Sequence, residues 1–89
     1  MLDLLREVIA GRALSMPLAE HLGFHVVEAE LGVVTVELAP GEVHQNLSGT
    51  VHGGVLSVIA DSAMGLAFGT TVEAGQTFTT VEQKINYLR

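Results

Sequence analysis

The chain has 89 residues, which is room for one small domain. Its net charge of −6 and its four scattered basic residues exclude the basic patch that binding to nucleic acid requires. The absence of cysteine excludes disulfides, thiolate metal sites and cysteine nucleophiles.

Apolar residues make up 48% of the chain and charged residues only 16%, which is little polarity for the surface of so small a domain. We therefore expect the chain to oligomerise, and we expect further residues to cover part of it. The N-terminus mixes charged and apolar residues and lacks the layout of a signal peptide. The longest apolar stretch is interrupted by Asp61, serines and glycines, so we expect no membrane span and a cytoplasmic protein.

Two short helices are predicted at the N-terminal end. Residues 2–10 place their leucine, valine and isoleucine side chains on one face, which is typical of an amphipathic helix, and Gly11 ends it. Pro17 suits the first position of a second helical turn, which Gly23 closes.

A β-hairpin is predicted next. Val34, Val36 and Leu38 alternate with polar residues, a period that indicates a strand with one buried face. Residues 24–30 are the expected partner strand, and Gly32 lies in the turn between them.

The second half of the chain predicts a polar loop, a long helix and a strand. The loop covers residues 41–51, the helix runs from about 53 to 70, and residues 77–88 are rich in β-branched and aromatic side chains. The long helix is apolar nearly all round, which is typical of a buried helix.

Asp61 is the single ionisable side chain in that helix. A lone carboxylate in apolar surroundings is costly unless it is paired or used. Gly53 and Gly54 would leave backbone N–H groups uncovered at the positive end of the helix dipole. Such a helix end and a carboxylate are the parts needed to polarise a carbonyl and attack it, which favours an enzyme.

The predicted order is two short helices, two strands, a long helix and a third strand. Three strands cannot cover a buried helix of this length, so we expect much of it to be exposed. We also expect that a complete protein of this kind continues beyond Arg89 for several more strands.

The motif Asn46-Leu-Ser-Gly-Thr-Val-His-Gly-Gly, then Asp61, then the sequence of residues 80–89, resembles the hotdog-fold acyl-CoA thioesterases. Within them it is most similar to the phenylacetic-acid-degradation, or PaaI-like, branch. The resemblance spans nearly the whole chain, but the chain covers about the first two-thirds of such a domain. Residues 1–89 would therefore form a single, partial hotdog thioesterase domain.

The resemblance implies an α+β fold in which a curved antiparallel sheet wraps a long central helix. It implies an acyl-CoA substrate, and subunits joined edge to edge into homodimers that commonly pair into homotetramers. It implies no cofactor. The missing C-terminal portion would complete the sheet and supply part of the coenzyme A site, so the activity of the 89-residue chain by itself is an open question.

The resemblance also implies roles for single residues. Asp61 would act as nucleophile or general base, and the Gly53 N–H would polarise the thioester carbonyl. Asn46 would hold the carbonyl or the attacking water, and Thr80 would orient that water. Thr79 is close enough in sequence to be confused with Thr80.

His52 and Gly54 complete the expected substrate-binding set together with Thr79. Simpler structural roles stay open for these positions: the glycines suit a tight turn, His52 suits a hydrogen bond that holds it, and Asn46 suits a turn. His44 and His52 do not form a known ligand pattern, so no metal site is predicted.

Two rival functions stay open. A hotdog dehydratase or hydratase would need a histidine paired with an acid, whereas the histidine nearest the helix precedes the glycines. The other rival is a fragment or subunit without catalytic function, which contributes only to the fold and to contacts in an oligomer.

Helix geometry adds one constraint. Eight residues separate Gly53 from Asp61, which is about 12 Å along a helix. Either these groups do not cooperate, or a second subunit supplies Asp61, and the resemblance favours the second.

Overall fold

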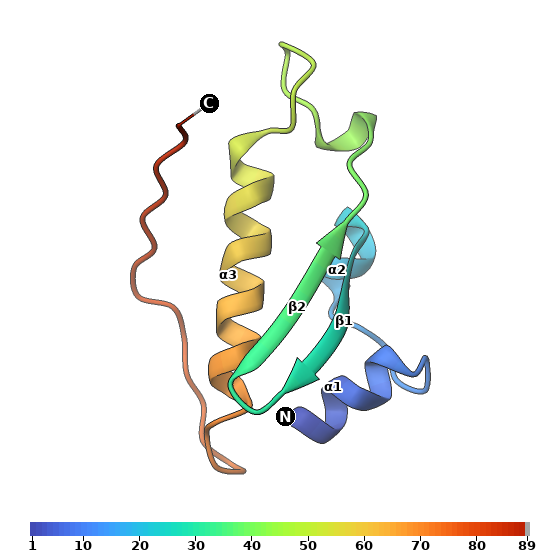
Figure 1. The fold of residues 1–89 in the computed structure, drawn as a ribbon, viewed down its shortest axis with the longest axis vertical. Helices are drawn as coiled ribbons and strands as arrows, with labels where there is room; N and C mark the ends of the chain where they lie inside the picture. Colours follow the sequence, from blue (N-terminus) through green and yellow to red (C-terminus); the bar gives the residue numbers. More distant parts are fainter. Residues whose placement is uncertain (89) are drawn as a thin grey trace.

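The computed structural model describes residues 1–88, and Arg89, the last residue of the motif, lies outside the described residues. A long helix occupies the centre, with the β-hairpin and the two short helices on one side of it and an extended C-terminal segment on the other (Figure 1). The elements are α1 (Leu2–Ile9), α2 (Pro17–Leu22), β1 (Phe24–Glu30), β2 (Val33–Leu38), the 3-10 helix η1 (Glu42–His44) and α3 (Gly53–Gly69).

Both short helices form where the sequence predicts them. Gly11 follows α1 with a φ of 78°, and Gly23 ends α2 with a φ of 82°, a left-handed conformation that glycine adopts at little cost. Pro17 opens α2, where its missing N–H leaves no helical bond unmade. Local turn chemistry therefore sets the ends of these helices.

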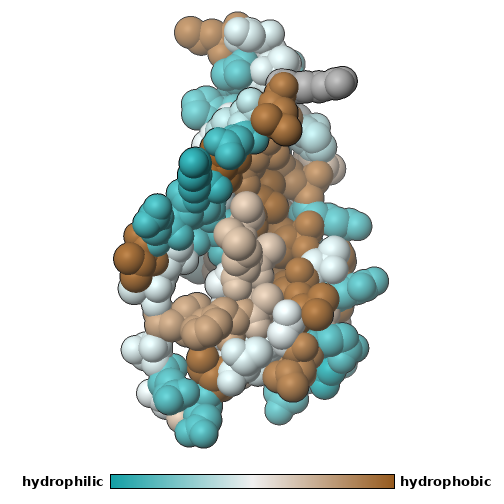
Figure 2. Space-filling view, turned by 60° about the vertical axis from the view of Figure 1, so that its left-hand side comes forward, coloured by the Kyte–Doolittle hydropathy of each residue, from teal (hydrophilic) through white to brown (hydrophobic). Residues whose placement is uncertain are grey.

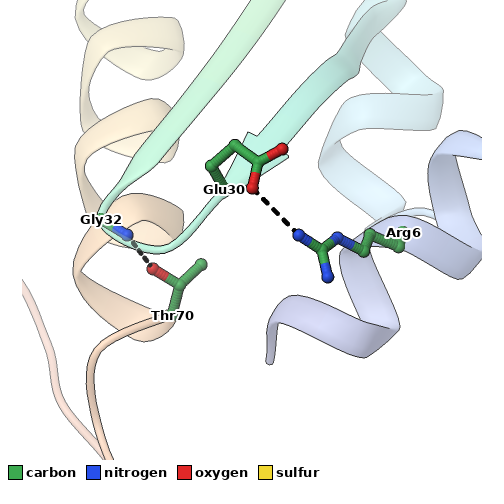
Figure 3. Close-up of polar contacts among 4 residues, drawn as sticks. All are labelled: Arg6, Glu30, Gly32 and Thr70. Atoms are coloured by element: carbon green, nitrogen blue, oxygen red, sulfur yellow. Dashed lines mark hydrogen bonds and ion pairs between the residues drawn. The ribbon is translucent and has the colours of Figure 1, made fainter.

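The hairpin is also confirmed. β1 and β2 pair antiparallel, with Val26 opposite Val36 and Phe24 opposite Leu38, and a bulge interrupts the register after Val26. Gly32 lies in the turn with a φ of 77°. Its N–H donates to the Thr70 hydroxyl at 2.7 Å, which ties the hairpin to the end of α3 (Figure 3).

The core is small and lies between the hairpin and α1. Leu5, Val26 and Ala29 are buried there, and the partly buried Leu66 brings α3 against them. A surface ion pair of 3.1 Å between Arg6 and Glu30 flanks it (Figure 3) and contributes about 0–1 kcal/mol. The α+β class predicted from the sequence is confirmed.

α3 is much less buried than its apolar sequence would favour. Within this helix Gly69 is the buried residue, while Met64 and Phe68 are each 55% exposed and Leu56 is 45% exposed. Figure 2 shows apolar surface on the side of the molecule where α3 and the C-terminal segment lie. The expectation that these elements leave much of the helix exposed is confirmed.

The prediction of a strand over residues 77–88 is wrong for the described chain. The backbone there is extended and runs beside α3 toward its N-terminal end (Figure 1), but it joins no sheet. An extended segment becomes a strand by pairing with another, and among residues 1–88 the two strands lie across α3 from it. In the part of the chain that the structure describes, no helix is long and apolar enough to cross a membrane.

Candidate active site

Asp61 and Thr80 meet between α3 and the C-terminal segment. The Thr80 hydroxyl donates a hydrogen bond of 2.6 Å to Asp61 Oδ1. Among residues 1–88 this is the hydrogen bond that the carboxylate accepts, so its other lone pairs are available to a water or a substrate. Of the two neighbouring threonines, Thr80 contacts the carboxylate.

Two hollows adjoin this pair. One, of about 310 Å³, is lined mainly by apolar groups and extends along α3 past Met64 and Phe68 to Phe78. The other, of about 370 Å³, is lined by Ser57, Val58 and Gln83. Asp61 and Thr80 line both, so the carboxylate lies at the boundary between an apolar and a more polar space.

Aromatic side chains wall the apolar hollow. The rings of Phe68 and Phe78 have centroids 5.1 Å apart and planes at 75°, an edge-to-face arrangement that aromatic pairs prefer. Thr79 lies on the same wall, without the contact to Asp61 that Thr80 makes. This hollow can therefore receive an apolar group held close to the carboxylate.

The N-terminus of α3 is capped by His52. Its Nδ1 accepts the N–H of Gly54 at 2.8 Å. Within residues 1–88 the Gly53 N–H has no acceptor. Of the two glycine amides, Gly53 is therefore the one that can donate to a ligand, and its position at the start of the helix adds the favourable end of the helix dipole.

Tyr87 lies against Gly53, a contact that sequence reasoning missed. Its hydroxyl donates to the Gly53 carbonyl at 2.6 Å and lies 3.3 Å from the Ser57 hydroxyl. A side chain at position 53 would place its Cβ 3.1 Å from the Tyr87 ring. Positions 53, 57 and 61 recur every four residues on one helix face, a spacing that could have marked this face as the one the C-terminal segment covers.

The side chain of Asn46 makes its hydrogen bonds within its own turn. Its Oδ1 accepts the N–H groups of Ser48 and Thr50 at 2.9 and 3.2 Å, and its Nδ2 donates to the Thr50 hydroxyl at 2.9 Å. Asn46 and His52 line one hollow, whereas Asp61 and Thr80 line others. One copy of the chain thus brings Asp61 and Thr80 together but presents Asn46 and Gly53 at the other end of the helix.

Residues 48–89 match the thioesterase superfamily. The matched segment carries Gly53 at the free helix end and the Asp61–Thr80 pair. Together with the long helix and the antiparallel hairpin, this match confirms the predicted α+β hotdog class. Comparison with curated proteins found no match, and comparison with solved structures found none.

No metal site is seen in the described part of the chain, where no three histidine, aspartate or glutamate side chains gather closely enough to hold an ion.

Proposed function

We propose that the protein hydrolyses acyl-CoA thioesters to a free acid and coenzyme A. The match to the thioesterase superfamily supports thioester hydrolysis, and the observation that carries the residue roles is the hydrogen bond from Thr80 to Asp61. This hydrogen bond orients the Asp61 carboxylate beside an apolar hollow and leaves its second oxygen available to act as a base or a nucleophile.

As a general base, Asp61 takes a proton from water while the oxygen of that water attacks the thioester carbonyl carbon. The carbonyl oxygen then carries developing negative charge, which a backbone N–H at a helix start stabilises. When the C–S bond breaks, the sulfur leaves with the electron pair and takes up a proton as the thiol. As a nucleophile, Asp61 would instead form an anhydride that water hydrolyses; the same contacts serve both routes.

The Gly53 N–H that polarises the carbonyl is best supplied by a second subunit. On one helix the two positions are about 12 Å apart, whereas a carboxylate must come within roughly 3–3.5 Å of the atom it attacks, or one water further as a base. A homodimer with antiparallel α3 helices would bring the partner subunit's Gly53 to Asp61. The exposed apolar side chains of α3 support such an assembly, as a homodimer or as a homotetramer made of two dimers.

The apolar hollow beside Asp61 suits the acyl group. A cavity of about 150 Å³ lined by apolar side chains is enough to hold benzene, and this one is about 310 Å³ with two phenylalanine rings in its wall. We therefore propose an aryl or a short to medium acyl group, as in the phenylacetic-acid-degradation branch. Thr79 on that wall and His52 and Gly54 at the helix start would complete the substrate contacts.

The hydratase alternative receives less support, because the His52 Nδ1 is engaged with the Gly54 N–H. A subunit without catalytic function is the alternative that experiment must exclude.

The decisive experiment measures thioester hydrolysis with benzoyl-, phenylacetyl- and butyryl-CoA for the wild type and for Asp61→Asn. We expect the variant to lose at least about a hundredfold in rate, or about 2.7 kcal/mol of barrier, with its circular dichroism unchanged. Glu73→Gln, an exposed carboxylate away from the site, is the matched control. A rate for Asp61→Asn within about threefold of wild type, under roughly 0.7 kcal/mol, would rule the assignment out.

A further inference from the structure

His44 is the buried histidine among the described residues, with 5% of its surface exposed, and the proposed chemistry does not use it. It ends η1, the short turn between the hairpin and the loop that leads into α3. Its ring bridges two segments of backbone. Nδ1 accepts the Gly41 N–H at 2.9 Å, and Nε2 lies 2.6 Å from the carbonyl oxygen of Leu22, the last residue of α2.

These two contacts define the state of the ring. A backbone N–H can only donate, so Nδ1 must be without a proton; a backbone carbonyl can only accept, so Nε2 must carry one. His44 is therefore neutral, in the Nε2–H tautomer. No other uncharged form makes both hydrogen bonds.

The backbone of His44 connects the ring to the start of α3. Its carbonyl accepts the His52 N–H at 2.7 Å, and Gln45 and Val51 pair as an isolated β-bridge just beyond. The two ends of this loop are thus held together, and the His44 ring attaches them to α2. His52 in turn accepts the Gly54 N–H, next to the Gly53 N–H, which has no acceptor within residues 1–88.

We propose that His44 is a positioning residue: by joining α2, the Gly41 turn and His52, it fixes the direction in which the Gly53 N–H points. Its effect on catalysis rests on the proposed thioester hydrolysis, but the hold on the helix start does not. A histidine that only fills space would be replaceable by phenylalanine of similar shape. A positioning histidine would not be, because phenylalanine leaves the Gly41 N–H and the Leu22 carbonyl unpaired.

The first test is the tautomer in the wild-type protein. Long-range proton–nitrogen NMR spectra distinguish a protonated ring nitrogen from an unprotonated one. We expect a protonated Nε2 and an unprotonated Nδ1 for His44, with the tautomer mixture of a free imidazole for the exposed His21. A protonated Nδ1, or a mixture at His44 like that of His21, overturns the proposal.

The second test is amide hydrogen exchange in His44→Phe, with His21→Gln on α2 as the matched control. We expect the His52 and Gly54 amides to lose at least about tenfold in protection in His44→Phe and to be unchanged in the control. His44→Gln and His44→Asn can each retain one of the two ring contacts, so intermediate losses are expected from them. These two variants decide the matter if His44→Phe does not fold. Wild-type protection at both amides in folded variants overturns the proposal.

Turnover separates this inference from the proposed function. In an active protein the His44 variants should lower kcat about tenfold or more while KM stays within about twofold, since a misdirected Gly53 N–H acts on the transition state. Loss through KM alone contradicts the proposal. If the wild type hydrolyses no thioester, the proposed function fails, whereas the tautomer and the exchange rates still decide whether His44 holds the helix start.

Discussion

Tyr87 and Gly53, 34 residues apart, are joined by a hydrogen bond of 2.6 Å from the tyrosine hydroxyl to the glycine carbonyl. The Tyr87 ring also occupies the space that a side chain at position 53 would need. A glycine at position 53 therefore leaves room for this ring, in addition to the close approach of a ligand that the proposed function requires at its N–H. The contact with Tyr87 is present in the chain itself, without a substrate.

The Tyr87 contact reverses the usual effect of replacing a helical glycine. Alanine in place of glycine normally stabilises a helix by roughly 0.5–1 kcal/mol. At position 53 the new Cβ would lie 3.1 Å from the ring, so we expect Gly53→Ala to lower the free energy of unfolding by about 1 kcal/mol instead.

Urea unfolding of a double-mutant cycle checks this. In a Tyr87→Ala background the same Gly53→Ala change should be neutral or stabilising, a coupling of about 1 kcal/mol or more. Equal effects of Gly53→Ala in both backgrounds would show that Tyr87 does not restrict position 53.

The second prediction concerns the hydroxyl of Thr80. Thr80→Val removes the hydrogen bond to Asp61 while keeping the shape, and we expect turnover to fall about tenfold or more because the carboxylate loses its orientation. Thr80→Ser keeps the hydroxyl and should keep most of the rate. Steady-state kinetics of the two variants give the comparison, and equal rates for them would remove Thr80 from the proposed mechanism.

The third prediction tests the shared site. A variant with a bulky residue at Gly53 and the Asp61→Asn variant are each expected to be inactive. When subunits of the two exchange at random, half of the dimers are mixed and each mixed dimer regains one site of two, so activity should rise to about a quarter of wild type. Exchange is confirmed with a fluorescent label on each variant. A mixture that stays inactive after confirmed exchange argues against a site built from two subunits.

The fourth prediction concerns pH and the N-terminal helix. The Arg12 guanidinium donates two hydrogen bonds to the Glu7 carboxylate and lowers the pKa of Glu7 below its ordinary value of 4.5. A carboxyl whose pKa is lower in the folded state stabilises that state above its unfolded pKa, and the contribution is lost as pH falls through the folded pKa. Glu7→Gln should thus lower Tm slightly at pH 7, and by less at a pH well below the ordinary value of 4.5.

The effect is expected to be small, since the pair is exposed to solvent. Thermal melts at both pH values measure it, and Glu20→Gln, which has no ion pair among the described residues, is the control. A Tm difference between Glu7→Gln and wild type that persists at low pH would assign it to another cause.

Local sequence determined the elements of this protein. The ends of α1, α2 and the hairpin depend on Gly11, Gly23, Gly32 and Pro17, whose conformational preferences act within a few residues. The apolar pattern of α3 and the place of Asp61 in it are likewise properties of a short stretch. For these reasons the sequence predicted helix and hairpin positions well, and its motif indicated Asp61 and Gly53 as the reactive pair.

Tertiary structure decided what depends on partners distant in the chain. Thr80 rather than Thr79 contacts Asp61 across 19 residues, and Tyr87 reaches Gly53 across 34. The sequence placed His44 in a predicted loop without a metal role, whereas the fold puts its ring between Leu22 and Gly41. The segment 77–88 has the composition of a strand, yet a strand exists only when another one pairs with it, and α3 separates this segment from the sheet. Local conformational preference depends on neighbouring residues, whereas pairing and hydrogen bonding between distant segments require the packed chain.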